Sequence, residues 1–452
     1  MRQSHQLPLV GLLLFSLIPS QLCQSCVVSE KDYSHLRLLI SAMDNLEQIR
    51  GIYGASILLS QRLAGIQNPS LEEELSQRIQ DDMNRRDMSN LTSGQLALII
   101  LAFGACKNPD VRFIHDHHLV EKLGEKFKEE IKNMEIHNGN PLTNYYQLSF
   151  DVLTLCLFRG NYSISNVTHY FNPENKNFNL SGHFSVDTGA VAVLALTCVK
   201  RSISNGKIKA AIKDSDTIQK YIESLVHKIQ SEKNGGLFGN AYSTGEAMQA
   251  LFVASDYYQN ESNCQETLDA VFNNISQGVF RLPIAAAQIL PALLGKTYLD
   301  VNKTATCPQS PVNITDEPVP VVPTLSPENI SVIYCVKINE ISNCINITVK
   351  NGSVFLDVMK AAQEKNSTIY GFTMTETPWG PYITSVQGIW ANNNERTYWE
   401  LLSNNKSLSQ GKGEYAKQLR RVRCPKHLGV KVKVLVESVP RSWESNIHYL
   451  MI

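Results

Sequence analysis

The chain has 452 residues, of which 43% are hydrophobic, and this is enough for two domains that each bury an apolar core. Its 42 basic and 42 acidic side chains balance to a formal net charge of zero. Phosphate backbones and anionic membranes are bound through a surplus of Lys and Arg, so this balance argues against nucleic acid and membrane surfaces as partners.

The N-terminus has the layout of a cleavable secretory signal. Arg2 is followed by an apolar run from Leu7 to Ile18, then by Pro19 and small or polar residues up to Cys23. The run is shorter than the roughly 20 apolar residues that a membrane helix needs, and no later stretch reaches that length. We therefore expect residues 1–23 to be removed and the mature protein to be secreted and extracellular.

Cysteine usage agrees with an oxidising compartment. Removing Cys23 from the ten cysteines leaves nine, an odd number, widely spaced and without a CxxC or Cys/His cluster. We interpret them as disulfide cysteines rather than zinc ligands. Sequons, each predicting a solvent-facing site of a glycoprotein, occur at Asn90, Asn161, Asn166, Asn179, Asn260, Asn274, Asn302, Asn313, Asn329, Asn346, Asn351, Asn366 and Asn405.

Residues 24–307 repeat one theme, a polar segment followed by an apolar run of helical length. The runs begin at Gln95, Gln147, Thr188, Thr244 and Ala285 and recur every ~40 to 55 residues. Each run is apolar almost all round, which indicates a helix buried on several sides, and the amphipathic segments between them would form an outer layer. The pattern predicts an α/α toroid whose parallel inner helices gather their N-termini at one end.

The composition changes after Cys307. Residues 308–328 are rich in proline and predict an extended interdomain linker. Residues 329–413 contain alternating β-branched segments, including a hairpin that Cys335 and Cys344 could tie, and predict a small α+β, β-rich domain. Residues 414–452 form an atypical basic C-terminal tail, in which Cys424 is the odd thiol.

Three polar clusters stand immediately before predicted inner helices, at residues 143–147, 185–188 and 240–246. Helix capping explains part of them, because Ser185 can cap a helix and Ser243 has capping-box spacing to Glu246. Capping does not explain the remaining side chains, which would converge if the inner helices are parallel: Tyr145, Tyr146, Gln147, Asp187, Asn240 and Gln288. Such neutral hydrogen-bonding and aromatic groups suit a large, amide-rich ligand.

The sequence contains no GxSxG, HExxH or phosphate-binding glycine loop, so we expect no enzymatic activity. One alternative is a secreted toroid glycoside hydrolase with Asp187 and Glu246 as its acid/base pair. Another is a toroid that binds a protein partner, which requires a large exposed apolar patch. A carrier requires only two surfaces that face each other.

Several segments resemble one known family. They are LTNYYQLS at 142–149, FSVDTGA at 184–190, STGEAMQALF at 243–252, AAAQILPAL at 285–293, WGPYITSVQG at 379–388 and ANNNERTYWELLS at 391–403. The chain is similar, from its signal to about Gly413, to the cobalamin-carrier family that includes transcobalamin, gastric intrinsic factor and haptocorrin. The resemblance implies an α6/α6 barrel and a β domain with cobalamin (vitamin B12) bound between them.

The resemblance also implies a set of ligand-binding residues. From the barrel they are Gln95, Thr143, Asn144, Tyr145, Tyr146, Gln147, Asp187, Asn240, Ser243 and Gln288, and from the β domain they are Tyr382, Ile383, Trp399, Glu400 and Leu401. Amide and phenol groups would pair with the amide arms of the corrin, while Trp399 and Leu401 would cover its apolar face. A plain core role for Trp399 is the alternative.

The family further implies disulfides Cys26–Cys264, Cys106–Cys307 and Cys156–Cys198. His183 matches a histidine that coordinates cobalt in transcobalamin, and a neutral imidazole suits a transition metal. The alternative for His183 is a solvated loop histidine. As partners we expect cobalamin, corrinoid analogues and a cell-surface uptake receptor, bound by a monomer.

Overall fold

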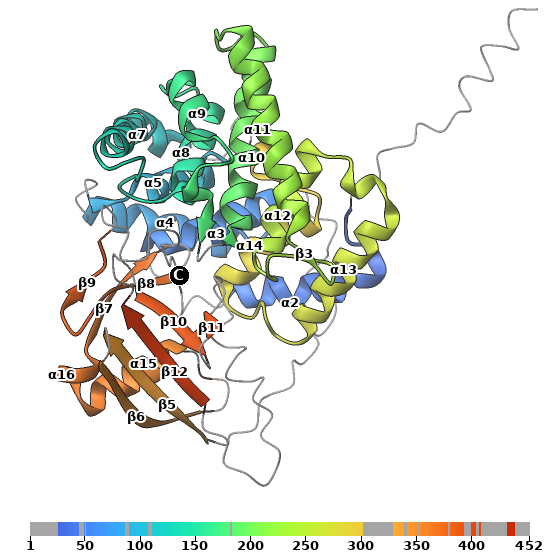
Figure 1. The fold of residues 1–452 in the computed structure, drawn as a ribbon. Helices are drawn as coiled ribbons and strands as arrows, with labels where there is room; N and C mark the ends of the chain where they lie inside the picture. The colour runs from blue at the N-terminus through green and yellow to red at the C-terminus, as the bar shows by residue number, and fades with distance from the viewer. Residues whose placement is uncertain are drawn as a thin grey trace, which may run out of the picture.

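A computed structural model of the chain describes residues 26–44, 49, 51–85, 90–106, 111–180, 183–301, 329–338, 341–350, 353, 355–377, 380–392, 399–403, 406–407 and 432–438. The predicted signal, the Pro-rich linker and most of the basic tail lie outside these residues. Within them the chain forms a mostly helical N-terminal domain and a small β-rich C-terminal domain (Figure 1).

The helical domain is built on helices that are buried on almost every side. They are α3 (Ala55–Ala64), α5 (Ser93–Gly104), α8 (Tyr145–Phe158), α10 (Val186–Ser204), α12 (Ser243–Ala254) and α14 (Pro283–Leu293). Every residue of α5 is buried, as its continuous apolar run predicts. The predicted apolar runs form all of these helices except α3. The apolar pattern did not predict α3, because its buried residues include the polar Gln61 and Arg62, which interrupt the apolar run.

Amphipathic helices pack outside the buried ones. They are α2 (Tyr33–Met43), α4 (Pro69–Arg85), α6 (Val111–Asp116), α7 (Leu119–Ile136), α9 (Ile164–Tyr170), α11 (Ile212–Ser231) and α13 (Glu261–Ser276). In α11 the buried residues Ile218, Ile222, Leu225 and Ile229 recur at helical spacing and so form one face. Each buried helix contacts the next one in chain order, and α14 contacts α3, so the series of contacts is closed.

Polar and covalent links join neighbouring helices. Arg62 on α3 is buried and donates from Nε to Glu72 Oε1 on α4 at 2.8 Å and from Nη1 to the carbonyl oxygen of Ala102 on α5 at 2.7 Å. Disulfides join Cys26 to Cys264 and Cys156 to Cys198, as the family resemblance implies. Cys106 is also disulfide-bonded, but its predicted partner Cys307 lies outside the described residues.

The β-rich domain contains a sheet with strand order β11-β10-β12-β5-β6. Its strands are β5 (Asn329–Ile338), β6 (Ile341–Lys350), β10 (Trp399–Ser403), β11 (Lys406–Ser407) and β12 (Val432–Ser438). The hairpin predicted from alternating residues is β5 with β6, in which Cys335 lies opposite Cys344 and is disulfide-bonded to it. A second sheet comprises β7 (Phe372–Thr377), β8 (Gly380–Val386) and β9 (Ile389–Trp390), and the helices are α15 (Phe355–Lys365) and α16 (Ser367–Tyr370).

The basic tail contributes a strand to this domain. β12 lies between β10 and β5, antiparallel to the first and parallel to the second. The rest of residues 408–452, including Cys424, lies outside the described residues. The segment that departs most from the family pattern therefore supplies an interior position of the sheet.

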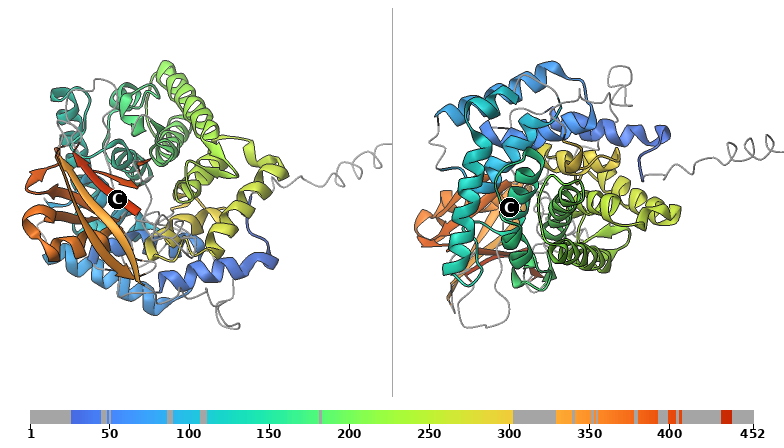
Figure 2. Two further views of the ribbon diagram at one scale, coloured as in Figure 1. Left: turned by 60° about the horizontal axis from the view of Figure 1, so that its bottom comes forward. Right: turned by 90° about the horizontal axis from the view of Figure 1, so that it is seen from above.

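The two domains lie against each other. In Figure 1 the β-rich domain is beneath the helical domain, and in the view from above in Figure 2 its strands lie behind the helices. No helix in the described ranges is both long and apolar enough to cross a bilayer.

The predicted glycosylation sites differ in their exposure to solvent. Asn90, Asn161 and Asn260 are exposed, as glycan acceptors must be. Asn274 on α13 is instead only 6% exposed, and its Nδ2 donates to the carbonyl oxygen of Ala270 at 2.7 Å. The prediction that Asn274 faces solvent is therefore wrong, because the buried face of an amphipathic helix carries this sequon.

We expect Asn274 to be unmodified in the secreted protein, because a glycan on its buried amide nitrogen would displace the packing of α13. Enzymatic deglycosylation in heavy-oxygen water followed by peptide mass spectrometry converts each occupied Asn to labelled Asp. The exposed Asn260, on the turn before the same helix, is the matched control. A labelled Asp at position 274 would contradict the burial of this side chain.

Candidate ligand-binding site

The first turns of α5 and α8 interlock through polar side chains. Thr92 Oγ1, at the N-cap of α5, donates to Gln147 Oε1 on α8 at 2.6 Å. Gln95 forms a capping box with Thr92, because its Oε1 accepts from the Thr92 backbone nitrogen at 3.0 Å. Gly94 permits this approach, since a Cβ there would lie 2.5 Å from the Cβ of Gln147. The predicted ligand residues Gln95 and Gln147 are therefore brought together.

A second polar contact joins α8 to α12. The Tyr146 hydroxyl donates to Glu246 Oε1 at 2.6 Å. These two side chains line a cavity of about 10 Å³ together with Ser56, Gln288 and Tyr298, which is room for about one water molecule. Ser56 lies in the first turn of α3, and Ile284, in the first turn of α14, also lines this cavity. The N-terminal turns of α3, α8, α12 and α14 therefore gather around one point, as parallel inner helices predict.

The approach of α12 to α14 depends on a glycine. A Cβ at Gly245 would lie 2.6 Å from the carbonyl oxygen of Gln288 and 3.0 Å from the Cα of Ile289. These are backbone atoms that cannot move aside cheaply. Gly245 therefore sets the position of Gln288, a predicted ligand residue.

Asn240 and Ser243 form a tight turn before α12. Asn240 Oδ1 accepts from the backbone nitrogens of Tyr242 at 2.8 Å and Ser243 at 3.0 Å, while Ser243 Oγ donates to the carbonyl oxygen of Phe238 at 2.8 Å. The capping-box hypothesis for Ser243 and Glu246 is therefore wrong. Asn240 instead accepts from the backbone nitrogens at the start of α12, and Glu246 accepts from the Tyr146 hydroxyl.

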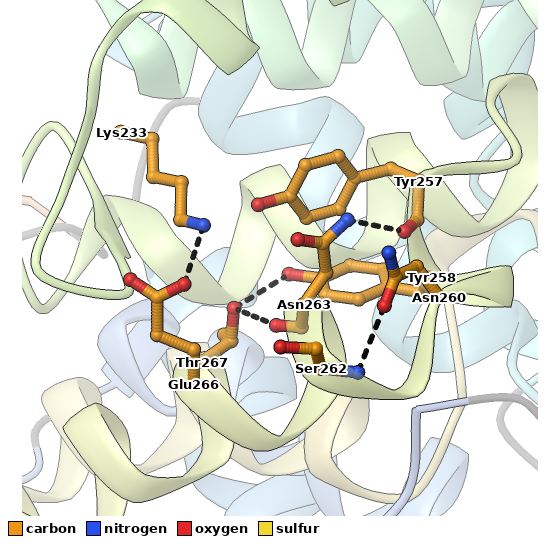
Figure 3. A network of polar contacts seen from close by, with 8 residues as sticks. All are labelled: Lys233, Tyr257, Tyr258, Asn260, Ser262, Asn263, Glu266 and Thr267. Carbon is orange, nitrogen blue, oxygen red and sulfur yellow. Dashed lines mark hydrogen bonds and ion pairs between the residues drawn. The ribbon is translucent and has the colours of Figure 1, made fainter.

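A polar network joins the segment before this turn to α13 (Figure 3). The turn follows a short hairpin of β3 (Lys233–Asn234) and β4 (Leu237–Phe238). Lys233 Nζ donates to Glu266 Oε2 on α13 at 2.6 Å and lies 5.6 Å from the ring centroid of Tyr257. Asn263 Nδ2 donates to the Tyr257 carbonyl oxygen at 3.0 Å. The hairpin that leads to Asn240 is therefore tied to α13.

The cluster before α10 contains both capping and accessible groups. Ser185 Oγ accepts from the Thr188 backbone nitrogen at 3.3 Å, which confirms its predicted capping role. Asp187 is half-buried in the first turn. Burial, followed by the charge of Glu246, raises the pKa of Tyr146 and of Tyr298, and the charge of Asp187 adds to both increases. His183 is exposed on β2 (His183–Phe184), two residues before the cap. No cluster of three or more metal-binding side chains occurs in the described ranges.

The segment before α8 divides between core and surface. Asn144 is half-buried and caps α8, since its Oδ1 accepts from the Gln147 backbone nitrogen at 2.9 Å. Tyr145 is buried among aromatic rings, and its hydroxyl accepts from Asn175 Nδ2 at 2.8 Å. Thr143 is buried beside Glu130. Tyr145 thus lies in the core, whereas Asn144 and Tyr146 keep accessible surface.

The predicted residues of the β-rich domain lie within its own core. Ile383, Trp399 and Leu401 are each less than 5% exposed and belong to the apolar cluster around Val332. Trp399 Nε1 donates to the Ile389 carbonyl oxygen at 3.0 Å. In this structure the indole therefore has the packing of a core tryptophan. The side chains of Tyr382 and Glu400, also predicted to bind the ligand, lie outside the described part of the structure.

Two buried carboxyl groups lie behind the site, and the sequence analysis missed both. Glu130 on α7 accepts from Ser93 Oγ at 2.9 Å and from the Thr143 backbone nitrogen at 3.1 Å. Asp151 on α8 is fully buried, and the charge of Glu130 acts on it. Burial raises the pKa of both carboxyl groups. An acidic residue inside the apolar run after Gln147 was the available signal for Asp151.

Asp151 makes stability depend on pH. Burial first, and the charge of Glu130 second, raise the pKa of Asp151 well above the unfolded value of 3.8. At pH values between 3.8 and the raised native pKa, the native state therefore keeps a proton that the unfolded state has released. The stabilising contribution is fully present below pH 3.8 and is lost as the pH rises toward the raised native pKa.

We expect Asp151→Asn to gain stability relative to the parent protein as the pH rises from 4 to 7. For each unit by which the pH rises, up to the native pKa, the gain in the free energy of unfolding should approach about 1.4 kcal/mol. Urea unfolding of both proteins across this range measures the difference in the free energy of unfolding. The exposed Asp269→Asn is the control. A difference between Asp151→Asn and parent that is constant with pH would contradict a raised pKa.

Comparison with known proteins identifies the family. Residues 8–326 match the family described as eukaryotic cobalamin-binding protein, and residues 352–418 match a domain family of unknown function, DUF4430. Transcobalamin-1 of Sus scrofa is 86% identical over 403 residues, covering 88% of this chain and 94% of its own length. Transcobalamin-1 of Homo sapiens is 57% identical over 420 residues, covering 92% and 96%.

A solved structure agrees with these relatives. A crystal structure of haptocorrin in complex with Cbi superimposes with a TM-score of 0.80 at 51% sequence identity, covering 92% of this chain and 99% of that chain. The chain therefore belongs to the eukaryotic cobalamin-binding protein family. It is a cobalamin-binding transport protein rather than an enzyme, which confirms the sequence-based expectation and removes the glycoside hydrolase alternative.

Proposed function

We propose that this protein is a secreted, extracellular carrier that holds cobalamin between its helical and β-rich domains. The observation that carries the proposal is the gathering of amide and phenol groups at the N-terminal turns, through the Thr92–Gln147 and Tyr146–Glu246 contacts. Cobalamin is large and carries many amide arms, so such groups can pair with it without a net charge on the protein. Its corrin ring is rigid, which keeps the ordering cost of binding low.

The helical domain is, in this proposal, an α6/α6 barrel. The closed series of contacts from α3 through α14 and the amphipathic outer helices support that assignment. In a barrel with parallel inner helices, the N-terminal ends form one rim. The β-rich domain beneath the helices in Figure 1 would supply the opposite surface.

The ligand-binding residues on the helical side are proposed to be those that keep accessible surface near this rim. They include Asn144, Tyr146, Asp187, Asn240 and Gln288, each half-buried. Gln95, Thr143, Gln147 and Ser243 are buried at the same rim, where they position the first turns. Ile383, Trp399 and Leu401 are packed in the core of their own domain, so on this side the contact is proposed to come from the strands that carry them, β8 and β10. A surface of this kind would also accept corrinoid analogues and leave the outer helices open to an uptake receptor.

The direct test is retention of the ligand by the secreted protein. We expect one cobalamin per chain to co-elute on gel filtration after incubation with excess cyanocobalamin, measured by visible absorbance. Gln288→Ala should raise the dissociation rate about tenfold, because a buried hydrogen bond to the ligand contributes roughly 1.5 kcal/mol. Gln265→Ala, on the exposed face of α13, is the matched control. Absence of bound cobalamin in the parent protein would refute the carrier assignment.

His183 is proposed to reach the cobalt when its upper axial position is exchangeable. Its exposed position on β2, close to Ser185 and Asp187, supports the proposal. A neutral imidazole that replaces water on cobalt shifts the visible spectrum. We expect His183→Ala to remove that shift when aquocobalamin is bound and to leave the cyanocobalamin spectrum unchanged. Identical aquocobalamin spectra for the parent and the variant would exclude coordination.

A further inference from the structure

We propose that Glu246 is a positioning residue for the ligand, because its buried carboxylate anchors the hydroxyl group of Tyr146 and so fixes the ring that Tyr146 offers to cobalamin. The proposal rests on the proposed function of the rim. It assigns to Glu246 a role that neither capping nor acid/base chemistry provides.

The hydrogen bond between the two side chains spans the interior of the helical domain. The contact series runs from α8 through α10 to α12, so the bond from Tyr146 on α8 to Glu246 on α12 joins two helices that are not neighbours in this series. Glu246 is 1% exposed, and its Oε1 lies 2.6 Å from the Tyr146 hydroxyl. This is the short distance typical of an O–H donor and a carboxylate acceptor.

The ring of Tyr146 is restrained along its length. Phe150, one turn further along α8, packs against it edge to face at 5.2 Å between centroids and 72° between planes. Burial, followed by the charge of Glu246, raises the pKa of Tyr146 well above 10.0, so the hydroxyl keeps its proton and donates it. Tyr146 as a whole is only half-buried. The hydroxyl end of the ring is therefore anchored, while the residue keeps accessible surface.

Stability alone does not explain a buried carboxylate at this position. Burying a charged group costs several kcal/mol, and a well-packed apolar side chain of similar volume often stabilises a fold better. A rigid contact surface does bring a benefit in binding, since side-chain ordering is completed before the ligand arrives. The hydrogen bond from the half-buried Tyr146 to Glu246 fits a role in ordering the ring before binding.

The test compares cobalamin dissociation rates with thermal stability in four variants of the full chain. Glu246→Ala should raise the dissociation rate about threefold to tenfold, the cost of ordering a ring during binding. Glu246→Gln should stay within about twofold of the parent, because its amide oxygen can still accept from Tyr146. Tyr146→Phe removes the same bond from the other side, and combining it with Glu246→Ala should add nothing further.

Thr154→Val is the matched control. It removes a buried hydrogen bond on the same helix, from Thr154 Oγ1 to the Ala97 carbonyl oxygen at 3.4 Å, away from the rim. It should lower the melting temperature and leave the dissociation rate unchanged. A rise in its dissociation rate equal to that of Glu246→Ala would overturn the proposal, because general destabilisation would then explain the effect.

Two further outcomes would also overturn it. One is a parent-like dissociation rate in folded Glu246→Ala or Tyr146→Phe, and the other is multiplication of their effects in the double variant. If Glu246→Ala does not fold, the comparison of Tyr146→Phe with Glu246→Gln decides the question. A parent protein that retains no cobalamin refutes the carrier function itself, which is a separate result.

Discussion

The structure depends on how the first turns of its buried helices satisfy their backbone N–H groups. The first turn of any α-helix leaves donors without intrahelical partners, and these helices are too deeply packed for water to serve all of them. Side chains accept at the starts of three of these helices, as Thr92 does in α5, Asn144 in α8 and Ser185 in α10, and Asn240 accepts from the first backbone nitrogen of α12. This requirement concentrates polar groups at one end of an otherwise apolar domain. The same polar groups make that end suitable for an amide-rich ligand.

In the proposed site, capping and ligand binding are therefore parts of one arrangement. Gln147 is held by Thr92, and its backbone nitrogen is held by Asn144, so its position is fixed before a ligand binds. Asn240 uses its side-chain oxygen for two backbone donors, so its amide group is also held in place. Polar groups fixed in this way lose little freedom on binding, and a rigid corrin ring loses little as well.

Much of this could be predicted from the sequence. Continuous apolar runs predicted α5, α8, α10, α12 and α14. A helix buried on all sides is apolar on all sides, so polar residues do not interrupt the run. α3 was missed because its buried surface includes Gln61 and Arg62, which are satisfied by tertiary contacts invisible in a single sequence. The polar clusters marked the starts of α8, α10 and α12.

The sequence could not assign individual roles within those clusters. Ser243 and Glu246 have capping-box spacing, yet Asn240 caps the turn and Glu246 contacts a residue 100 positions away. An indole side chain is typical of residues that stack on flat ligands, yet Trp399 packs in the core of its own domain. Both outcomes depend on long-range packing, which local spacing does not encode.

The β-rich domain places a different constraint on the site. Its sheet takes an interior strand, β12, from the basic tail, so the tail supports the strand β10 that carries Trp399 and Leu401. The surface presented by β10 therefore depends on residues near the C-terminus. The two sides of the proposed site consequently have different origins, one in helix ends and the other in strand pairing.

The most direct test of the account is hydrogen–deuterium exchange of the protein with and without cobalamin. If the ligand binds at the rim, exchange should slow in residues 143–147, 185–188 and 240–243 and in β8 and β10. The C-terminal ends of α5, α8 and α12 should be unaffected. Protection confined to those C-terminal ends, or to the outer helices, would contradict the account.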